Sequence, residues 1–85
     1  MNSRQTKTLV LVFDEPAQHL QIKWASVSSL IKALGGTVEQ GHGSRAKIRI
    51  GDRTAYIHTP HPHKELKAYQ VRAIRELLES QEIKP

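Results

Sequence analysis

The chain has 85 residues, a formal charge of +5 at pH 7 and a pI near 9.9. A chain of this length forms one domain at most, with a core too small to enclose a deep cofactor pocket, so function is expected on a surface and no cofactor is expected. The positive charge favours a polyanionic partner such as nucleic acid, an anionic membrane or an acidic protein. Cysteine is absent, which excludes disulfides and zinc–thiolate sites and makes the cytoplasm the expected location.

Residues 1–22 are interpreted as an N-terminal extension that precedes a compact domain over residues 23–85. In the extension, the β-branched run Leu9–Phe13 is compatible with a strand, but Ser3 could equally begin a capped helix that ends before Pro16. The apolar run is far shorter than the roughly 20 residues needed to span a bilayer, so no association with a membrane is expected.

A helix is predicted over residues 25–34, followed by a short strand over residues 37–40. The helix is indicated by four apolar side chains at helical spacing, namely Val27, Leu30, Ile31 and Leu34. The pair Gly35-Gly36 supplies the left-handed conformation that ends a helix.

The segment Arg45–Ile50 alternates basic and apolar residues and predicts a strand with two different faces. Side chains on a strand point to opposite faces with period two, so Ala46 and its two isoleucines share one face, whereas Arg45, Lys47 and Arg49 share the other. Cations two residues apart lie about 6.6 Å from one another, near the spacing of successive phosphates in a nucleic-acid strand. The outer face therefore suits a phosphate backbone, although a solvated sheet face has the same pattern.

A two-residue turn at Gly51-Asp52 predicts that residues 53–58 return as an antiparallel strand. This turn sets the register, which pairs Lys47 with Tyr56 and Arg45 with His58 on the outer face. A last helix over residues 67–80 is expected to bury an apolar stripe made of Val71, Ile74, Leu77 and Leu78. The prediction is an α+β fold of two layers in the order α-β-β-β-α, with both helices on one face of a three-stranded antiparallel sheet.

Three short elements of the chain match a known family. They are Leu34-Gly35 before the first strand, Gly43-Ser44 before the basic strand, and the segment His61-Pro-His-Lys-Glu-Leu-Lys67 before the last helix. Together with the order of the elements, they make residues 27–78 similar to the HicA toxins of bacterial toxin–antitoxin systems. The histidine–proline segment is the most specific of the three elements.

The resemblance implies a fold like a miniature double-stranded-RNA-binding domain and an mRNA target in the cytoplasm. It also implies cleavage of that mRNA without a metal, and neutralisation by a HicB-type antitoxin that covers the active surface. The residues expected to contact RNA are Arg45, Lys47, Arg49, Tyr56, His61, Lys64 and Lys67.

The catalytic base is expected to be a histidine other than the usual one. Better-known members of the family carry a histidine directly after the glycine–serine pair, and that histidine is thought to act in RNA cleavage. Here the position is Arg45, and a guanidinium cannot act as a general base near neutral pH. His58 is the first candidate to accept the 2′-hydroxyl proton, because the hairpin register places it opposite Arg45. His42 in the glycine turn is the second candidate, and His61 is the third.

Two other functions are compatible with the sequence, and a third is not expected. A non-catalytic RNA-binding module is favoured by Arg45, which stands where the family has its histidine. A protein-interaction domain for an acidic partner is favoured by the basic face. A metal site at His58, His61 and His63 is not expected, because the neighbouring prolines hold the segment extended and no Asp, Glu or Cys completes a ligand set.

Overall fold

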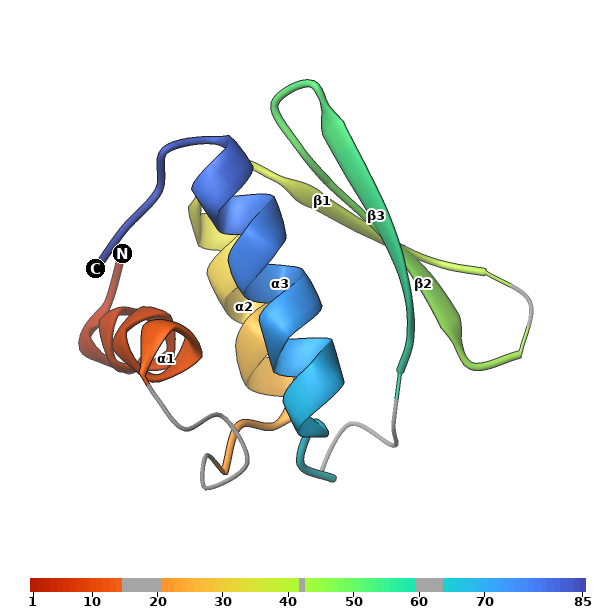
Figure 1. The fold of residues 1–85 in the computed structure, drawn as a ribbon, viewed down its shortest axis with the longest axis horizontal. Coiled ribbons are helices and arrows are strands. Elements are labelled where there is room, and N and C mark those ends of the chain that lie inside the picture. The colour runs from red at the N-terminus through yellow and green to blue at the C-terminus, as the bar shows by residue number, and fades with distance from the viewer. Residues whose placement is uncertain (15–20, 42, 60–63) are drawn as a thin grey trace.

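The computed structural model describes residues 1–14, 21–41, 43–59 and 64–85 of the protein. Its elements in chain order are α1 (Ser3–Phe13), α2 (Trp24–Ala33), β1 (Thr37–Gln40), β2 (Arg45–Ile50), β3 (Arg53–His58) and α3 (Ala68–Ser80). The helices α2 and α3 cover one face of the sheet, and α1 lies on the far side of these helices (Figure 1). The predicted α+β arrangement is confirmed, with α1 as an additional layer behind it.

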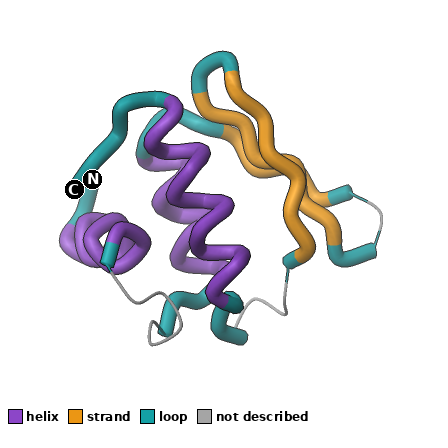
Figure 2. Tube along the Cα trace, in the orientation of Figure 1, coloured by secondary structure: helices purple, strands orange, loops and turns teal. Residues whose placement is uncertain are grey.

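The three strands form one antiparallel sheet in the order β1-β2-β3, with β2 in the centre (Figure 2). The register of β2 on β3 pairs Arg45 with His58 and Lys47 with Tyr56, which confirms the register predicted from the two-residue turn. Gly51 begins that turn with a φ of 59°, a conformation that glycine adopts without strain. The turn is held to the end of α3, because Gln81 donates from Nε2 to Asp52 Oδ1 at 3.0 Å.

The second glycine after α2 permits a close approach between this helix and the sheet. A Cβ atom at Gly36 would lie 2.6 Å from the backbone oxygen of Arg49 and 2.7 Å from Cγ1 of Ile50.

The bounds of α2 and α3 differ from the predicted ones by one residue. The helix α2 begins one residue earlier than predicted, at the buried Trp24, and α3 begins one residue later than predicted. Helix ends commonly differ by one residue between descriptions, and the packed faces agree with the prediction.

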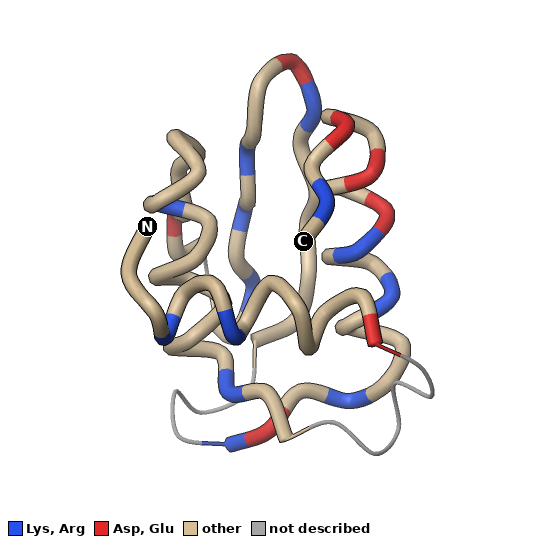
Figure 3. Tube along the Cα trace, turned by 90° about the vertical axis from the view of Figure 1, so that its left-hand side faces the viewer, with Lys and Arg blue, Asp and Glu red and all other residues tan. Residues whose placement is uncertain are grey.

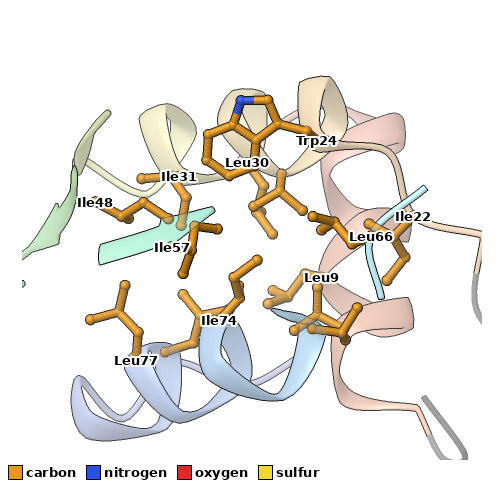
Figure 4. Close-up of a cluster of buried hydrophobic side chains, with 14 of the residues drawn as sticks. Leu9, Ile22, Trp24, Leu30, Ile31, Ile48, Ile57, Leu66, Ile74 and Leu77 are labelled. Carbon is orange, nitrogen blue, oxygen red and sulfur yellow. The ribbon is translucent and has the colours of Figure 1, made fainter. Parts of the chain in front are cut away.

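A single cluster of apolar side chains joins the sheet to all three helices (Figure 4). The inner face of β2 supplies Ala46, Ile48 and Ile50, each at most 5% exposed. The four predicted residues of α3 are also buried, namely Val71, Ile74, Leu77 and Leu78. No helix among the described residues covers the other face of the sheet, so that face is open to solvent.

The N-terminal segment is a helix rather than a strand. Asn2 caps it, because its Oδ1 accepts from the backbone N–H of Gln5 at 2.9 Å and Oε1 of Gln5 accepts from the backbone N–H of Asn2 at the same distance. Leu9 and Val12, three residues apart, are 4% and 0% exposed. Tertiary packing on α2 and α3 therefore selects the helix, although the residues alone are also compatible with a strand.

The C-terminal end of α1 is held by an arginine of α3. Arg75 donates from Nε to the backbone oxygen of Val12 at 2.8 Å and from Nη2 to that of Asp14 at 2.9 Å. These bonds satisfy carbonyls at a helix end that the helix itself cannot satisfy.

Of the helices in the described parts of the chain, none is long and apolar enough to cross a membrane.

Candidate nucleic-acid interface

The predicted cations lie in a row on the uncovered face of the sheet. Arg45 and Arg49 are exposed and Lys47 is half-buried, whereas the alternate residues of β2 are buried. In Figure 3, blue segments that mark Lys and Arg follow one another along one strand of the hairpin. Tyr56 and His58 lie on the same face in β3, and the Tyr56 side chain is 61% exposed. The structure therefore brings together five of the predicted site residues.

The pairing pattern places these residues in the closer type of antiparallel pair. Just beyond the ends of β2 and β3, the backbone N–H of Thr59 donates to the backbone oxygen of Ser44. Ser44 and Thr59 are therefore a hydrogen-bonded pair. Because the two types of pair alternate along an antiparallel ladder, Arg45 and His58 form the next, non-hydrogen-bonded pair, with Cα atoms about 4.5 Å apart and side chains close together. The same alternation makes Lys47 and Tyr56 a pair of this type.

Two contacts hold the end of β3 that carries His58. Thr59 adds a bond from its Oγ1 to the oxygen of Ser44 at 3.0 Å, which joins β3 to the glycine–serine element before β2. Gln70 of α3 donates from Nε2 to the backbone oxygen of His58 at 2.6 Å. The backbone around the Arg45–His58 pair is therefore fixed from both sides.

Gln70 binds the backbone of His58, and it is not among the residues predicted from the sequence. Its side chain is 5% exposed, and its Oε1 accepts from the backbone N–H of Lys67 at 2.7 Å while its amide group binds His58. A signal for it exists in the sequence, because glutamine at the third position of a helix commonly bonds back to the capping residue. The second bond, to a strand twelve residues earlier, depends on the packing of α3 against the sheet.

The strand β1 adds a carboxylate and two hollows to this face. Glu39 is paired with Lys47 across β1 and β2. A hollow of ≈ 330 Å³ is lined by residues that include Glu39, Arg45, Lys47 and Tyr56. A second hollow, of ≈ 350 Å³, also uses Glu39 and Lys47 and extends toward Arg49. The outer face is therefore a cationic surface with depressions along it.

The remaining predicted residues are placed differently. Lys67 precedes α3 and lies near the end of β3, because its backbone is joined to His58 through Gln70. Lys64 is exposed beside the short bridge between Lys23 and Glu65, and is not brought onto the sheet face. The predicted residues His42 and His61 lie outside the described residues.

The chemistry available on this face is that of anion binding and proton transfer. The guanidinium groups of the exposed arginines and the ammonium group of the half-buried Lys47 can bind phosphate. The Tyr56 ring can stack on a base, and the His58 imidazole can accept or donate a proton. Among the described residues no three His, Asp or Glu side chains gather in a way that could hold a metal ion.

Comparison with known proteins gives one match. A sequence model of the family described as the HicA toxin of bacterial toxin–antitoxin systems matches residues 24–81, which include α2, the whole sheet and α3. No curated protein and no solved structure matches the chain. The helix α1 lies before the matched region.

Proposed function

The chain belongs to the HicA family of toxins of bacterial toxin–antitoxin systems, and from this membership we propose that it is a toxin that binds and cleaves mRNA in the cytoplasm. A HicB-type antitoxin neutralises it by covering the outer face of the sheet. The described helices cover only the opposite face of the sheet, which leaves this face available to both partners. An antitoxin surface that fits it carries acidic side chains opposite the cations of β2.

The RNA backbone follows the cations of β2. Their spacing of about 6.6 Å along the strand is close to that of phosphates in an extended nucleic-acid strand. Tyr56 beside Lys47 offers a stacking surface for a base, a contact worth about 1–3 kcal/mol per base. Uncovered sheets with exposed aromatic residues bind unpaired RNA in this way.

The cross-strand pair of Arg45 and His58 supplies the chemistry of cleavage, and this pair is the observation that carries the proposal. His58 takes the proton from a ribose 2′-hydroxyl, and the 2′-oxygen then bonds to the adjacent phosphorus. The bond from phosphorus to the 5′-oxygen breaks, and that oxygen takes up a proton from solvent. Arg45 stabilises the additional negative charge on the phosphate oxygens. The product is a 2′,3′-cyclic phosphate, and no metal takes part.

The proposal is tested by expressing the protein without its antitoxin and by incubating the purified protein with mRNA in the presence of a chelator. We expect growth arrest and RNA fragments that end in a cyclic phosphate. His58→Ala should abolish both. The His58 side chain is exposed, so the variant should fold, and circular dichroism checks this directly. His42→Ala tests the second candidate base in the same assays. Full activity in His58→Ala would refute the role of this residue.

A further variant exploits the departure from the family pattern. Arg45→His in the His58→Ala background returns an imidazole to the position after Gly43-Ser44, directly across the strand pair. If cleavage depends on an imidazole at this point of the face, the double variant should recover part of the activity.

A non-catalytic RNA-binding protein on the same fold is the second candidate, and Arg45 at the usual histidine position is the observation that favours it. It predicts that RNA binding weakens steeply as salt concentration rises, with no cleavage at any concentration of protein. Intact RNA after incubation with a protein that binds it would support this second function.

A further inference from the structure

A single carboxylate interrupts the cationic face of the described strands. Glu39 is exposed in β1, directly across from Lys47. Its carboxylate makes no hydrogen bond or ion pair with the described residues. A negative charge at this point repels phosphate, so it weakens rather than strengthens contact with an RNA backbone. Its chemistry suits a different part of a nucleotide.

Glu39 borders a hollow that matches the size of a small planar ligand. The hollow has a volume of ≈ 330 Å³ and is also lined by Lys47 and Tyr56. The volumes of small-molecule pockets start at about 300 Å³, so this hollow has room for a single nucleotide unit. Glu39, Lys47 and Tyr56 form one row across the three strands, which places the first and last of them two strand spacings apart, about 9.5 Å. A base that stacks on Tyr56 and lies over Lys47 would present its edge to Glu39.

The carboxylate selects among the bases by the hydrogen bonds that it can accept. An ionised Glu side chain accepts only, through two oxygens. Guanine presents two adjacent donors, N1–H and the N2 amino group, on its Watson–Crick edge, and these match both oxygens. Adenine and cytosine each present one amino group beside an acceptor nitrogen, and uracil presents one N–H between two carbonyls. Guanine is the base that forms two parallel bonds with the carboxylate.

We propose that this hollow is a guanine-binding subsite, in which Tyr56 stacks on the base and Glu39 accepts hydrogen bonds from N1–H and N2–H. This inference rests on the proposed RNA-directed function and specifies the base that the surface selects. The cations of β2 hold the flanking phosphates, and Glu39 supplies the discrimination. Cleavage is therefore directed to phosphates near unpaired guanines.

The test measures binding to dodecamers of 2′-O-methyluridine that carry G, A, C or U at one central position. The 2′-O-methyl group prevents cleavage, so fluorescence anisotropy reports affinity alone. We expect the guanine oligonucleotide to bind about tenfold more tightly than the other three, a value within the range for a bidentate base contact. Glu39→Gln replaces one acceptor oxygen by an amide N–H₂ and should reduce this preference to less than about twofold.

Glu79→Gln is the matched control, because it removes the same charge from an exposed position of α3, on the other side of the sheet. Both variants should bind all four oligonucleotides slightly more tightly, because each lacks one negative charge of the wild type. Only Glu39→Gln should lose the preference for guanine. Equal binding of all four oligonucleotides by the wild type, or a preference that survives in Glu39→Gln, would overturn the subsite and leave RNA binding intact. Absence of binding to any oligonucleotide would overturn the proposed function together with it.

Discussion

Replacing Gln70 by leucine tests whether the backbone behind His58 matters for function. Leucine is similar in size and apolar, so it fits the buried position but removes the bonds of 2.6 Å to His58 and 2.7 Å to Lys67. Each bond contributes about 1 kcal/mol net, and the carbonyl of the exposed His58 regains part of its hydrogen bonding from water. We therefore expect a loss of about 1.5 kcal/mol in the free energy of unfolding. For a chain of this size, the corresponding fall in Tm is about 6–12 °C.

Gln5→Leu is a control with the same chemistry at a different place. The Gln5 side chain also accepts from the backbone N–H of its capping residue, Asn2, and donates from Nε2 to Oγ of Ser29 in α2 at 2.9 Å, but these bonds are exposed. It should lose less stability, about 0.5 kcal/mol, because water replaces exposed bonds. Urea unfolding followed by circular dichroism gives both free energies. RNA cleavage at a temperature where both variants are folded should fall only in Gln70→Leu. Equal stability losses would contradict the larger contribution assigned to the buried bonds, and unchanged cleavage in Gln70→Leu would refute the positioning role of this residue.

Four other substitutions have definite expected outcomes. Gly36→Ala forces a Cβ to within 2.6 Å of a backbone oxygen and should lower the free energy of unfolding by about 1–3 kcal/mol in urea titrations. Leu9→Ala should cost about 2–4 kcal/mol in the same titrations if α1 packs on the core as described, and no loss would contradict that packing. Arg49→Glu should weaken RNA binding at least tenfold and reduce its salt dependence, whereas Arg72→Glu on α3 should change both much less. Tyr56→Ala should lower RNA affinity at least fivefold while the free energy of unfolding changes by less than about 0.5 kcal/mol, since the side chain is 61% exposed.

Much of the candidate interface could be predicted from the sequence because it depends on local rules. The alternation from Arg45 to Ile50 separates a cationic face from a buried one, and the two-residue turn then determines which residues of β3 lie opposite. The pairing of Arg45 with His58 follows from these two facts alone. The resemblance to the HicA family is likewise visible in short segments of the sequence, and the family model matches residues 24–81.

Two residues of the interface could not be predicted because their roles depend on contacts between distant segments. Glu39 belongs to a short strand with little pattern of its own, and only its pairing with Lys47 places it in the hollow that Tyr56 also lines. Gln70 lies in a helix whose apolar stripe is clear, but its bond to His58 exists because α3 packs across the end of β3.

The sequence by itself determined the order of α2, the three strands and α3, the register of the hairpin and the sign of the charge on the outer face. These properties follow from side-chain periodicity and turn chemistry, which act over a few residues. The tertiary structure decided that the segment Ser3–Phe13 is a helix, because Leu9 and Val12 become buried only against α2 and α3 and Arg75 satisfies the carbonyls at its end. It also decided which polar side chains meet behind and beside His58, since these contacts form only when α3 and β1 pack around the central hairpin.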